Sequence, residues 1–153
     1  LLRADAVIGL EGRPKAAWLG GYDSGSDSVY QDVAVPAPAS TATSTSASTS
    51  SARAKLQFWY RITTHESSTT VASDKLTVDL VNPKTGAKLA TLATLSNLDR
   101  TNGWTKSLQY DLTPYQGQTV RLRFTAELNG TNITSFWLDD ISVFLATAAT
   151  ATF

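Results

Sequence analysis

Short runs with alternating apolar and polar side chains recur along this chain, and each run ends at a turn rich in proline, glycine or asparagine. Within each of the segments 29–35, 56–62, 76–80 and 120–124, every second side chain is mostly apolar. Because successive side chains of a strand point to opposite faces of a sheet, this period of two predicts half-buried β-strands. Residues 89–95, 104–112 and 136–144 are predicted to be strands as well.

The breaks between these runs have the chemistry of turns. Pro36 and Pro38 end the first run, because proline cannot donate a hydrogen bond to a sheet. Residues 82–86 read Asn-Pro-Lys-Thr-Gly, which predicts a hairpin over 75–95. Asn-Gly pairs at 102–103 and 129–130 mark further turns. Many short strands with no amphipathic helix predict an all-β fold, a two-sheet antiparallel β-sandwich of the jelly-roll type.

Composition limits the classes of function. The chain has 153 residues with 13 basic and 13 acidic side chains, so no basic field attracts nucleic acid. No apolar stretch approaches the ~20 residues of a membrane-spanning helix, so we expect no membrane insertion. Cysteine is absent, which excludes disulfides and thiolate chemistry. Methionine is absent too, so we expect a piece of a longer protein. The high content of serine, threonine and strand-forming residues favours a secreted protein.

A low-complexity segment interrupts the strands at 40–51, where ten of twelve residues are serine or threonine. Such a composition cannot offset its loss of conformational entropy by burying apolar surface. We therefore predict a flexible loop at about 40–52 inside a single domain that covers 1–153. An O-glycosylated or adhesive tract is the alternative interpretation.

Several segments resemble, in order, a known type of domain. They are Ala17–Tyr22 (AWLGGY), Asp27–Val33 (DSVYQDV), Leu56–Thr64 (LQFWYRITT), Asp74–Val78 (DKLTV), Tyr115–Leu122 (YQGQTVRL) and Phe136–Val143 (FWLDDISV). The set resembles jelly-roll accessory domains of secreted bacterial peptidases, notably kumamolisin-like and subtilisin-like enzymes. Those domains are similar to MAM domains and to jelly-roll carbohydrate-binding modules. The resemblance implies a non-catalytic accessory module whose partner is the catalytic domain of its parent chain.

Acidic residues near the two ends of the chain suggest a structural Ca²⁺ site. Glu11 precedes the first segment, and Asp139 and Asp140 lie in the last predicted strand, which typically runs beside the first in such jelly rolls. Ca²⁺ prefers six to eight oxygen ligands, and Asp27 and Asp23 are further candidates. The alternative is that these carboxylates accept hydrogen bonds from backbone N–H groups. Glu66 and Asp74 form a weaker candidate site.

Catalysis is not expected. The only histidine, His65, lies in a Thr/Ser-rich segment, and no nucleophile stands in a pattern that would use it as a base. The sequence Asp23-Ser24-Gly25 resembles the surroundings of a trypsin-like nucleophile, but a tyrosine replaces the glycine before it and no second glycine follows it. We interpret it as a turn.

The four tryptophans offer aromatic faces on which sugar rings could stack. Trp59 has the parity opposite to the apolar side chains of its strand, so Trp59 and Trp104 are the candidate ligand-binding residues. The alternative is that each of the four tryptophans, Trp18 and Trp137 included, lies in the core, as most tryptophans of such sandwiches do.

The sequence therefore predicts a non-catalytic accessory module of a secreted enzyme, expected to be a peptidase, stabilised by calcium. Its partner would be a polysaccharide, a cell-surface polymer or the catalytic domain. A carbohydrate-binding module is the first alternative, and a cell-surface adhesin or interaction domain is the second.

Overall fold

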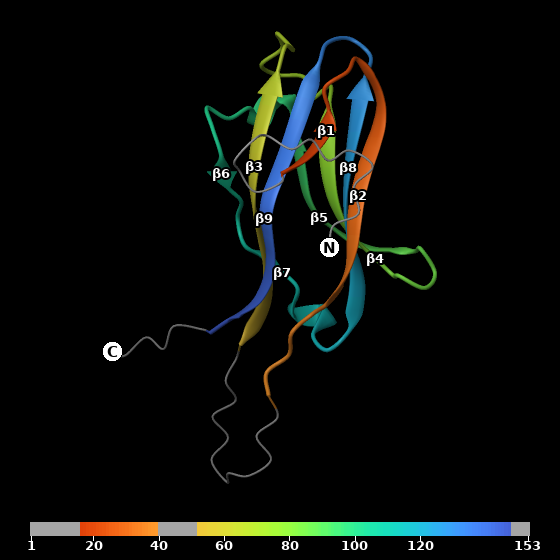
Figure 1. Ribbon diagram of the computed structural model, residues 1–153, viewed down its shortest axis with the longest axis vertical. Coiled ribbons are helices and arrows are strands. Elements are labelled where there is room, and N and C mark those ends of the chain that lie inside the picture. The colour runs from red at the N-terminus through yellow and green to blue at the C-terminus, as the bar shows by residue number, and fades with distance from the viewer. Residues whose placement is uncertain (1–15, 40–51, 148–153) are drawn as a thin grey trace, which may run out of the picture.

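The computed structural model describes residues 16–39 and 52–147, which form two antiparallel β-sheets packed face to face (Figure 1). This arrangement confirms the predicted β-sandwich of the jelly-roll type. The strands are β1 (Ala17–Gly20), β2 (Ser24–Ala34), β3 (Arg53–Thr64), β4 (Lys75–Val81), β5 (Lys88–Ser96), β6 (Thr105–Lys106), β7 (Tyr110–Asp111), β8 (Thr119–Asn129) and β9 (Thr134–Ala146). Two single-turn 3-10 helices complete the described chain, η1 (Asn97–Asp99) and η2 (Thr113–Tyr115).

The first sheet has the strand order β1-β9-β3-β6, with β7 also paired to β3. The short β1 lies against β9, with Ala17 opposite Leu138 and Gly20 opposite Ser135. The first and last strands of the described chain are thus neighbours, as the sequence predicted. On its other side, β9 pairs with β3 over nearly the full length of both strands.

The second sheet has the strand order β2-β8-β4-β5. The predicted hairpin over 75–95 is confirmed as β4 and β5. Its turn begins at Asn82, whose side-chain oxygen accepts hydrogen bonds from the backbone N–H groups of Lys84 and Thr85 at 2.9 and 3.2 Å. Gly86 closes the turn with a φ of 74°, a conformation that glycine adopts without strain.

The core lies between the two sheets and consists of the apolar side chains that alternate along each strand and face inward. Fully buried side chains include Phe58, Phe124 and Phe136 together with leucines, an isoleucine and valines from both sheets. Phe58 of β3 and Phe124 of β8 meet edge to face, with ring centroids 5.2 Å apart. The alternation that predicted the strands is therefore the alternation between this core and the two outer faces of the sandwich.

The prediction of one strand over 104–112 is wrong. The chain instead pairs with β3 at two short strands, β6 and β7, and the regular ladder between them is interrupted at 107–109. Between them the buried Ser107 accepts a hydrogen bond from the backbone N–H of Phe58 at 3.1 Å and donates one to the carbonyl of Leu108 at 2.8 Å. This hydroxyl takes the place of a backbone acceptor, which breaks the regular ladder and leaves Leu108 exposed.

Two further predictions concern the Ser/Thr-rich tract and membrane insertion. The Ser/Thr-rich tract, predicted as a loop within a single domain, lies in the connection between β2 and β3, outside the described residues. Within 16–39 and 52–147, no helix is long and apolar enough to cross a membrane.

Candidate functional site

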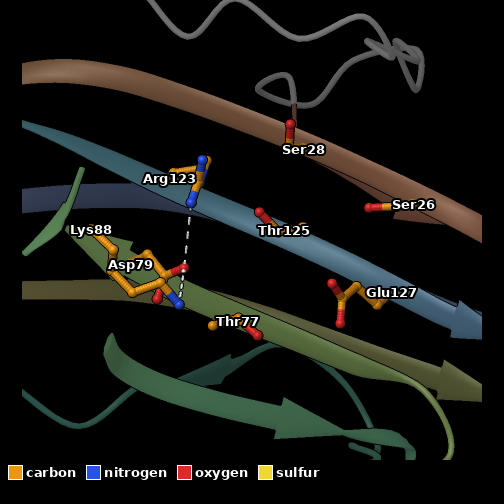
Figure 2. A pocket seen from close by; sticks show the side chains of 8 residues that line it. All are labelled: Ser26, Ser28, Thr77, Asp79, Lys88, Arg123, Thr125 and Glu127. Atoms are coloured by element: carbon orange, nitrogen blue, oxygen red, sulfur yellow. Dashed lines mark ion pairs between the residues drawn. The ribbon is translucent and has the colours of Figure 1, made fainter. Parts of the chain in front are cut away.

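The outer face of the second sheet is hollowed by a polar groove of about 400 Å³ (Figure 2). It runs over β2, β8 and β4 and reaches the start of β5. Serine and threonine hydroxyls and four charged side chains line it. The lining residues are Ser26, Ser28, Thr77, Asp79, Lys88, Arg123, Thr125 and Glu127.

The strand pattern places these side chains on one face. In β8 the core takes Leu122, Phe124 and Ala126, so Arg123, Thr125 and Glu127 point outward. Antiparallel pairing then sets residues from distant parts of the chain in one row across the sheet. The row is Tyr30 of β2, Arg123 of β8, Asp79 of β4 and Thr91 of β5.

Asp79 organises one end of the groove. Its side chain is 5% exposed. Thr91 donates a hydrogen bond to Oδ1 of Asp79 at 2.6 Å, and Lys88 Nζ lies 3.1 Å from Oδ2. Arg123 Nη2 lies 3.6 Å from the same Oδ2, longer than a hydrogen bond (Figure 2). Two cations therefore converge on one carboxylate.

Arg123 is incompletely satisfied by the protein. Its Nε is enclosed and has no hydrogen-bond partner among the described residues. Enclosed polar groups in proteins are nearly always hydrogen-bonded, and an arginine has five N–H donors to satisfy. The side chain as a whole is 35% exposed, so the Nη groups of the guanidinium retain capacity for an acceptor from outside the described chain.

The other end of the groove is acidic and rich in hydroxyl groups. Glu127 is exposed there and lies opposite Ser26 of β2 and Lys75 of β4 in the strand register. No ion pair joins Lys75 to Glu127 within the described residues. Thr125 and Thr77 supply hydroxyls between this carboxylate and the Asp79 end.

An exposed aromatic ring flanks the groove. Tyr30 has the parity of Ser26 and Ser28 on β2, so it shares their face, and it is 43% exposed. Arg121 lies over its ring at 4.4 Å from the centroid. The same guanidinium binds Asp32 through two contacts, of 2.7 and 3.1 Å.

The Asp32–Arg121 pair yields a prediction about pH. Hydrogen bonds from Arg121 lower the pKa of Asp32, partial burial opposes this weakly, and the charge of Arg121 lowers it further. Because this pKa lies below its unfolded value of ~3.9, the pair stabilises the fold above that pH. The contribution is lost as the pH falls through the lowered pKa. In Arg121→Ala we expect the pKa of Asp32 to rise toward ~3.9, as followed by NMR titration of its carboxyl carbon.

Arg61→Ala, an exposed arginine on the other sheet, is the matched control and is expected to leave this pKa unchanged. An unaltered pKa of Asp32 in Arg121→Ala would show that the contact is not formed in solution.

The residues predicted to bind calcium are not brought together within the described chain. Asp140 adopts a φ of 46° and donates its N–H to Oδ1 of Asp139 at 2.8 Å. Asp27 accepts a hydrogen bond from the backbone N–H of Gly20 at 2.8 Å.

Burial and the neighbouring Asp27 raise the pKa of Tyr22 to about 12.

Glu11 lies outside the described residues. Within 16–39 and 52–147, no three Asp, Glu or His side chains gather in a metal-binding group. The calcium site therefore stays a prediction.

The weaker candidate pair, Glu66 and Asp74, is buried and engaged by the protein itself. Asp74 accepts hydrogen bonds from the backbone N–H of Asn129 at 3.0 Å and from the hydroxyl of Thr134 at 2.5 Å. Glu66 accepts from Thr131 at 2.5 Å and from Asn132 at 3.3 Å. These carboxylates tie the β3–β4 connection to the β8–β9 turn.

The tryptophans divide differently from the prediction. Trp59 is half-buried on the outer face of the first sheet, in a second hollow of about 370 Å³ shared with Gln57, Lys106 and Asp140. Trp104 is 37% exposed and does not line that hollow. Their role in ligand binding stays a prediction.

The expectation that Trp18 and Trp137 are core residues is wrong. They stack on each other outside the first sheet with ring centroids 5.1 Å apart, because the inward positions of their strands belong to Leu19, Phe136 and Leu138.

Sequence reasoning missed the polar groove. The sequence of β8 did contain an indication of it, because the outward-facing positions of this alternating strand are the polar residues Arg123, Thr125 and Glu127. What the local pattern could not reveal was that β8 lies between β2 and β4.

Comparisons with known proteins bear on the fold alone. No protein-family model matches the chain, and no curated protein matches it. Among solved structures, it is similar to the carbohydrate-binding module TmCBM61 in complex with β-1,4-galactotriose, with a TM-score of 0.55 and 12% identity. That match covers 95% of this chain and 88% of the other. It is also similar to the arabinose-bound α-L-arabinofuranosidase MgGH51, with a TM-score of 0.51 and 16% identity. There the match covers 94% of this chain but only 22% of the enzyme.

Proposed function

We propose that this chain is a carbohydrate-binding module that holds a polysaccharide in the polar groove of the β2-β8-β4-β5 sheet. The observation that carries the proposal is the groove itself, open to solvent and lined by hydroxyl and charged side chains beside an exposed tyrosine. The likeness over most of both chains to a module in complex with a galactotriose supports it. Of the functions predicted from the sequence, this one was the first alternative.

The lining chemistry suits a sugar chain. Each sugar hydroxyl both donates and accepts a hydrogen bond, and charged partners make the stronger of these bonds. The groove offers donors at Lys88 and Arg123, an acceptor at Glu127, and hydroxyls that can do either. The part of the exposed Tyr30 ring that Arg121 does not cover can pack against the C–H groups of a sugar.

We further propose that the module serves a polysaccharide-degrading enzyme. The arabinofuranosidase match supports this partner, because the matched part is a minor portion of a much larger glycosidase. A module that binds the polymer raises the effective concentration of substrate at a linked catalytic domain. The peptidase partner implied by the sequence resemblance has no such support from the fold comparisons. Secretion stays a prediction.

The test is binding of the domain to a panel of soluble polysaccharides by affinity electrophoresis, followed by calorimetry with oligosaccharides. We expect at least one of galactan, arabinan, xylan or a uronic-acid-bearing xylan to bind. Glu127→Ala removes an exposed charged acceptor and should weaken that binding about tenfold, since a charge-assisted hydrogen bond contributes ~1.5 kcal/mol or more.

Two variants on the other sheet sharpen this test. Arg61→Ala is a surface control and should bind as the wild type does. Trp59→Ala probes the second hollow, and it should also leave binding unchanged. Binding that is lost in Trp59→Ala but kept in Glu127→Ala would contradict the placement in the polar groove. A wild-type domain that binds no polysaccharide of the panel would contradict the function.

A further inference from the structure

The two ends of the polar groove differ in charge. At one end Lys88 and Arg123 face the single carboxylate of Asp79, which leaves one positive charge without a partner in the described chain. Glu127 stands at the other end, four residues along β8 from Arg123. At ~3.4 Å per residue these two side chains are separated by about 14 Å, roughly the length of two to three sugar units.

The cationic end is also organised around one carboxylate. Asp79 is buried, receives a hydrogen bond from Thr91 and draws both cations toward its Oδ2 atom. Because Asp79 is already shared among three donors, it cannot also satisfy the five N–H groups of Arg123. The Nε of Arg123 is enclosed, so a ligand would meet the Nη groups of this partly exposed side chain. The missing component is an acceptor with negative charge.

A planar carboxylate is the group that a guanidinium binds best, through two parallel hydrogen bonds. The protein does not supply this carboxylate from the adjoining row, because Asp32 there is already paired to Arg121. A ligand with acidic groups along its whole length would place one of them near Glu127. The complementary ligand therefore has an acid at one end and neutral sugar at the other.

We propose that the polar groove recognises a uronic acid in its polysaccharide, with the uronate carboxylate between Lys88 and Arg123 and neutral sugar units extending toward Glu127. This inference rests on the proposed function, and it names the class of sugar that the same groove takes. It assigns Asp79 a positioning role: Asp79 orients the two cations and does not touch the sugar.

The experiment compares matched ligands by calorimetry. Oligosaccharides with one glucuronic acid on a xylan or galactan backbone are measured as the free acid and as the carboxyl methyl ester, which keeps the skeleton and removes the charge. We expect the wild type to bind the acid of at least one backbone about tenfold more tightly than its ester. This preference should shrink as salt is added, because both cations are partly exposed and are screened by salt.

The variants Lys88→Gln and Arg123→Gln should each reduce the preference for the acid to about twofold or less. Lys88 is 53% exposed, so its replacement leaves the fold intact even if Arg123→Gln unfolds the domain. Lys106→Gln, an exposed lysine on the other sheet, is the matched control and should keep the full preference.

The outcomes separate the inference from the function it rests on. Equal affinity for acid and ester, with binding still weakened by Glu127→Ala, would overturn the uronate assignment and leave a neutral-sugar module. A preference that survives in Lys88→Gln would overturn the assignment as well. Absence of binding to acids, esters and the neutral panel would instead reject the proposed function.

Discussion

Replacing Phe58 by alanine is expected to lower the free energy of unfolding by about 3–5 kcal/mol, the usual cost of removing a buried phenylalanine. Phe58 is fully buried at the centre of β3. Its ring meets Phe124 of the opposite sheet edge to face and lies against Tyr110 and Tyr60 at centroid distances of 5.9 and 6.1 Å. The side chain therefore joins the two sheets, and its loss leaves a cavity that neighbours on regular strands cannot fill.

Urea denaturation followed by tryptophan fluorescence measures this change. Leu108→Ala is the matched control, because Leu108 is 77% exposed, and it should change stability by less than about 0.5 kcal/mol. A loss below about 1 kcal/mol in Phe58→Ala would mean that the two sheets are not packed through this residue.

Asp74→Ala is expected to destabilise the fold by about 2–5 kcal/mol, because it removes the shared acceptor of two enclosed donors. The backbone N–H of Asn129 and the hydroxyl of Thr134 both donate to Asp74, which is itself fully buried. The backbone of Asp74 is held in turn, since its N–H donates to the side chain of Asn97 at 3.2 Å. Thermal and urea unfolding both report the loss.

The controls for Asp74 separate hydrogen bonding from metal binding. Asp74→Asn keeps one acceptor oxygen and should lose less stability than Asp74→Ala, while Asp23→Ala, at an exposed bend, should lose almost none. The effect of Asp74→Ala should be the same in calcium and in EDTA. A difference that depends on calcium would contradict the structural role and restore the metal-ligand interpretation of Glu66 and Asp74.

The strands were predictable because their cause is local. Alternation at 56–62 and 120–124, and the turn chemistry of 82–86, depend on neighbouring residues only, and the structure confirms those elements. The segment 104–112 failed because Ser107 hydrogen-bonds to the backbone of Phe58, 49 residues away in sequence. The residues of that segment alone do not predict such a distant contact.

The last strand shows a subtler failure. Two adjacent aspartates in a regular strand, such as Asp139 and Asp140 in the predicted last strand, would point to opposite faces. In the structure Asp139 lies opposite Trp59 but Ser142 lies opposite Gln57, so one extra residue bulges out of β9. The left-handed φ of Asp140 accommodates it. A bulge changes the parity of every later residue, and no local pattern here marks its position.

The groove was beyond local reasoning for a topological reason. Asp79, Lys88 and Arg123 are unremarkable as isolated charges on predicted strands or turns. They become a site because β8 is inserted between β2 and β4, an order that the sequence pattern does not determine. The sequence analysis chose tryptophans as candidate ligand-binding residues because large aromatic side chains are easy to recognise in a sequence. The groove is instead lined by hydroxyl and charged side chains.

The antiparallel pairing of β1 with β9 has a mechanical consequence. β1 begins at Ala17, opposite Leu138, and β9 runs on past that point to Ala146 alongside β3 (Figure 1). A pulling force on the two ends of the described chain would therefore act on β1 through only four residue pairs, whereas β9 is held by β3 along nearly its whole length. The load would then pass through Gly20 and Gly21 directly into β2, an edge strand and one wall of the groove. We expect tension along the chain to detach β1 first and then to act on the β2 wall of the groove before the inner strands.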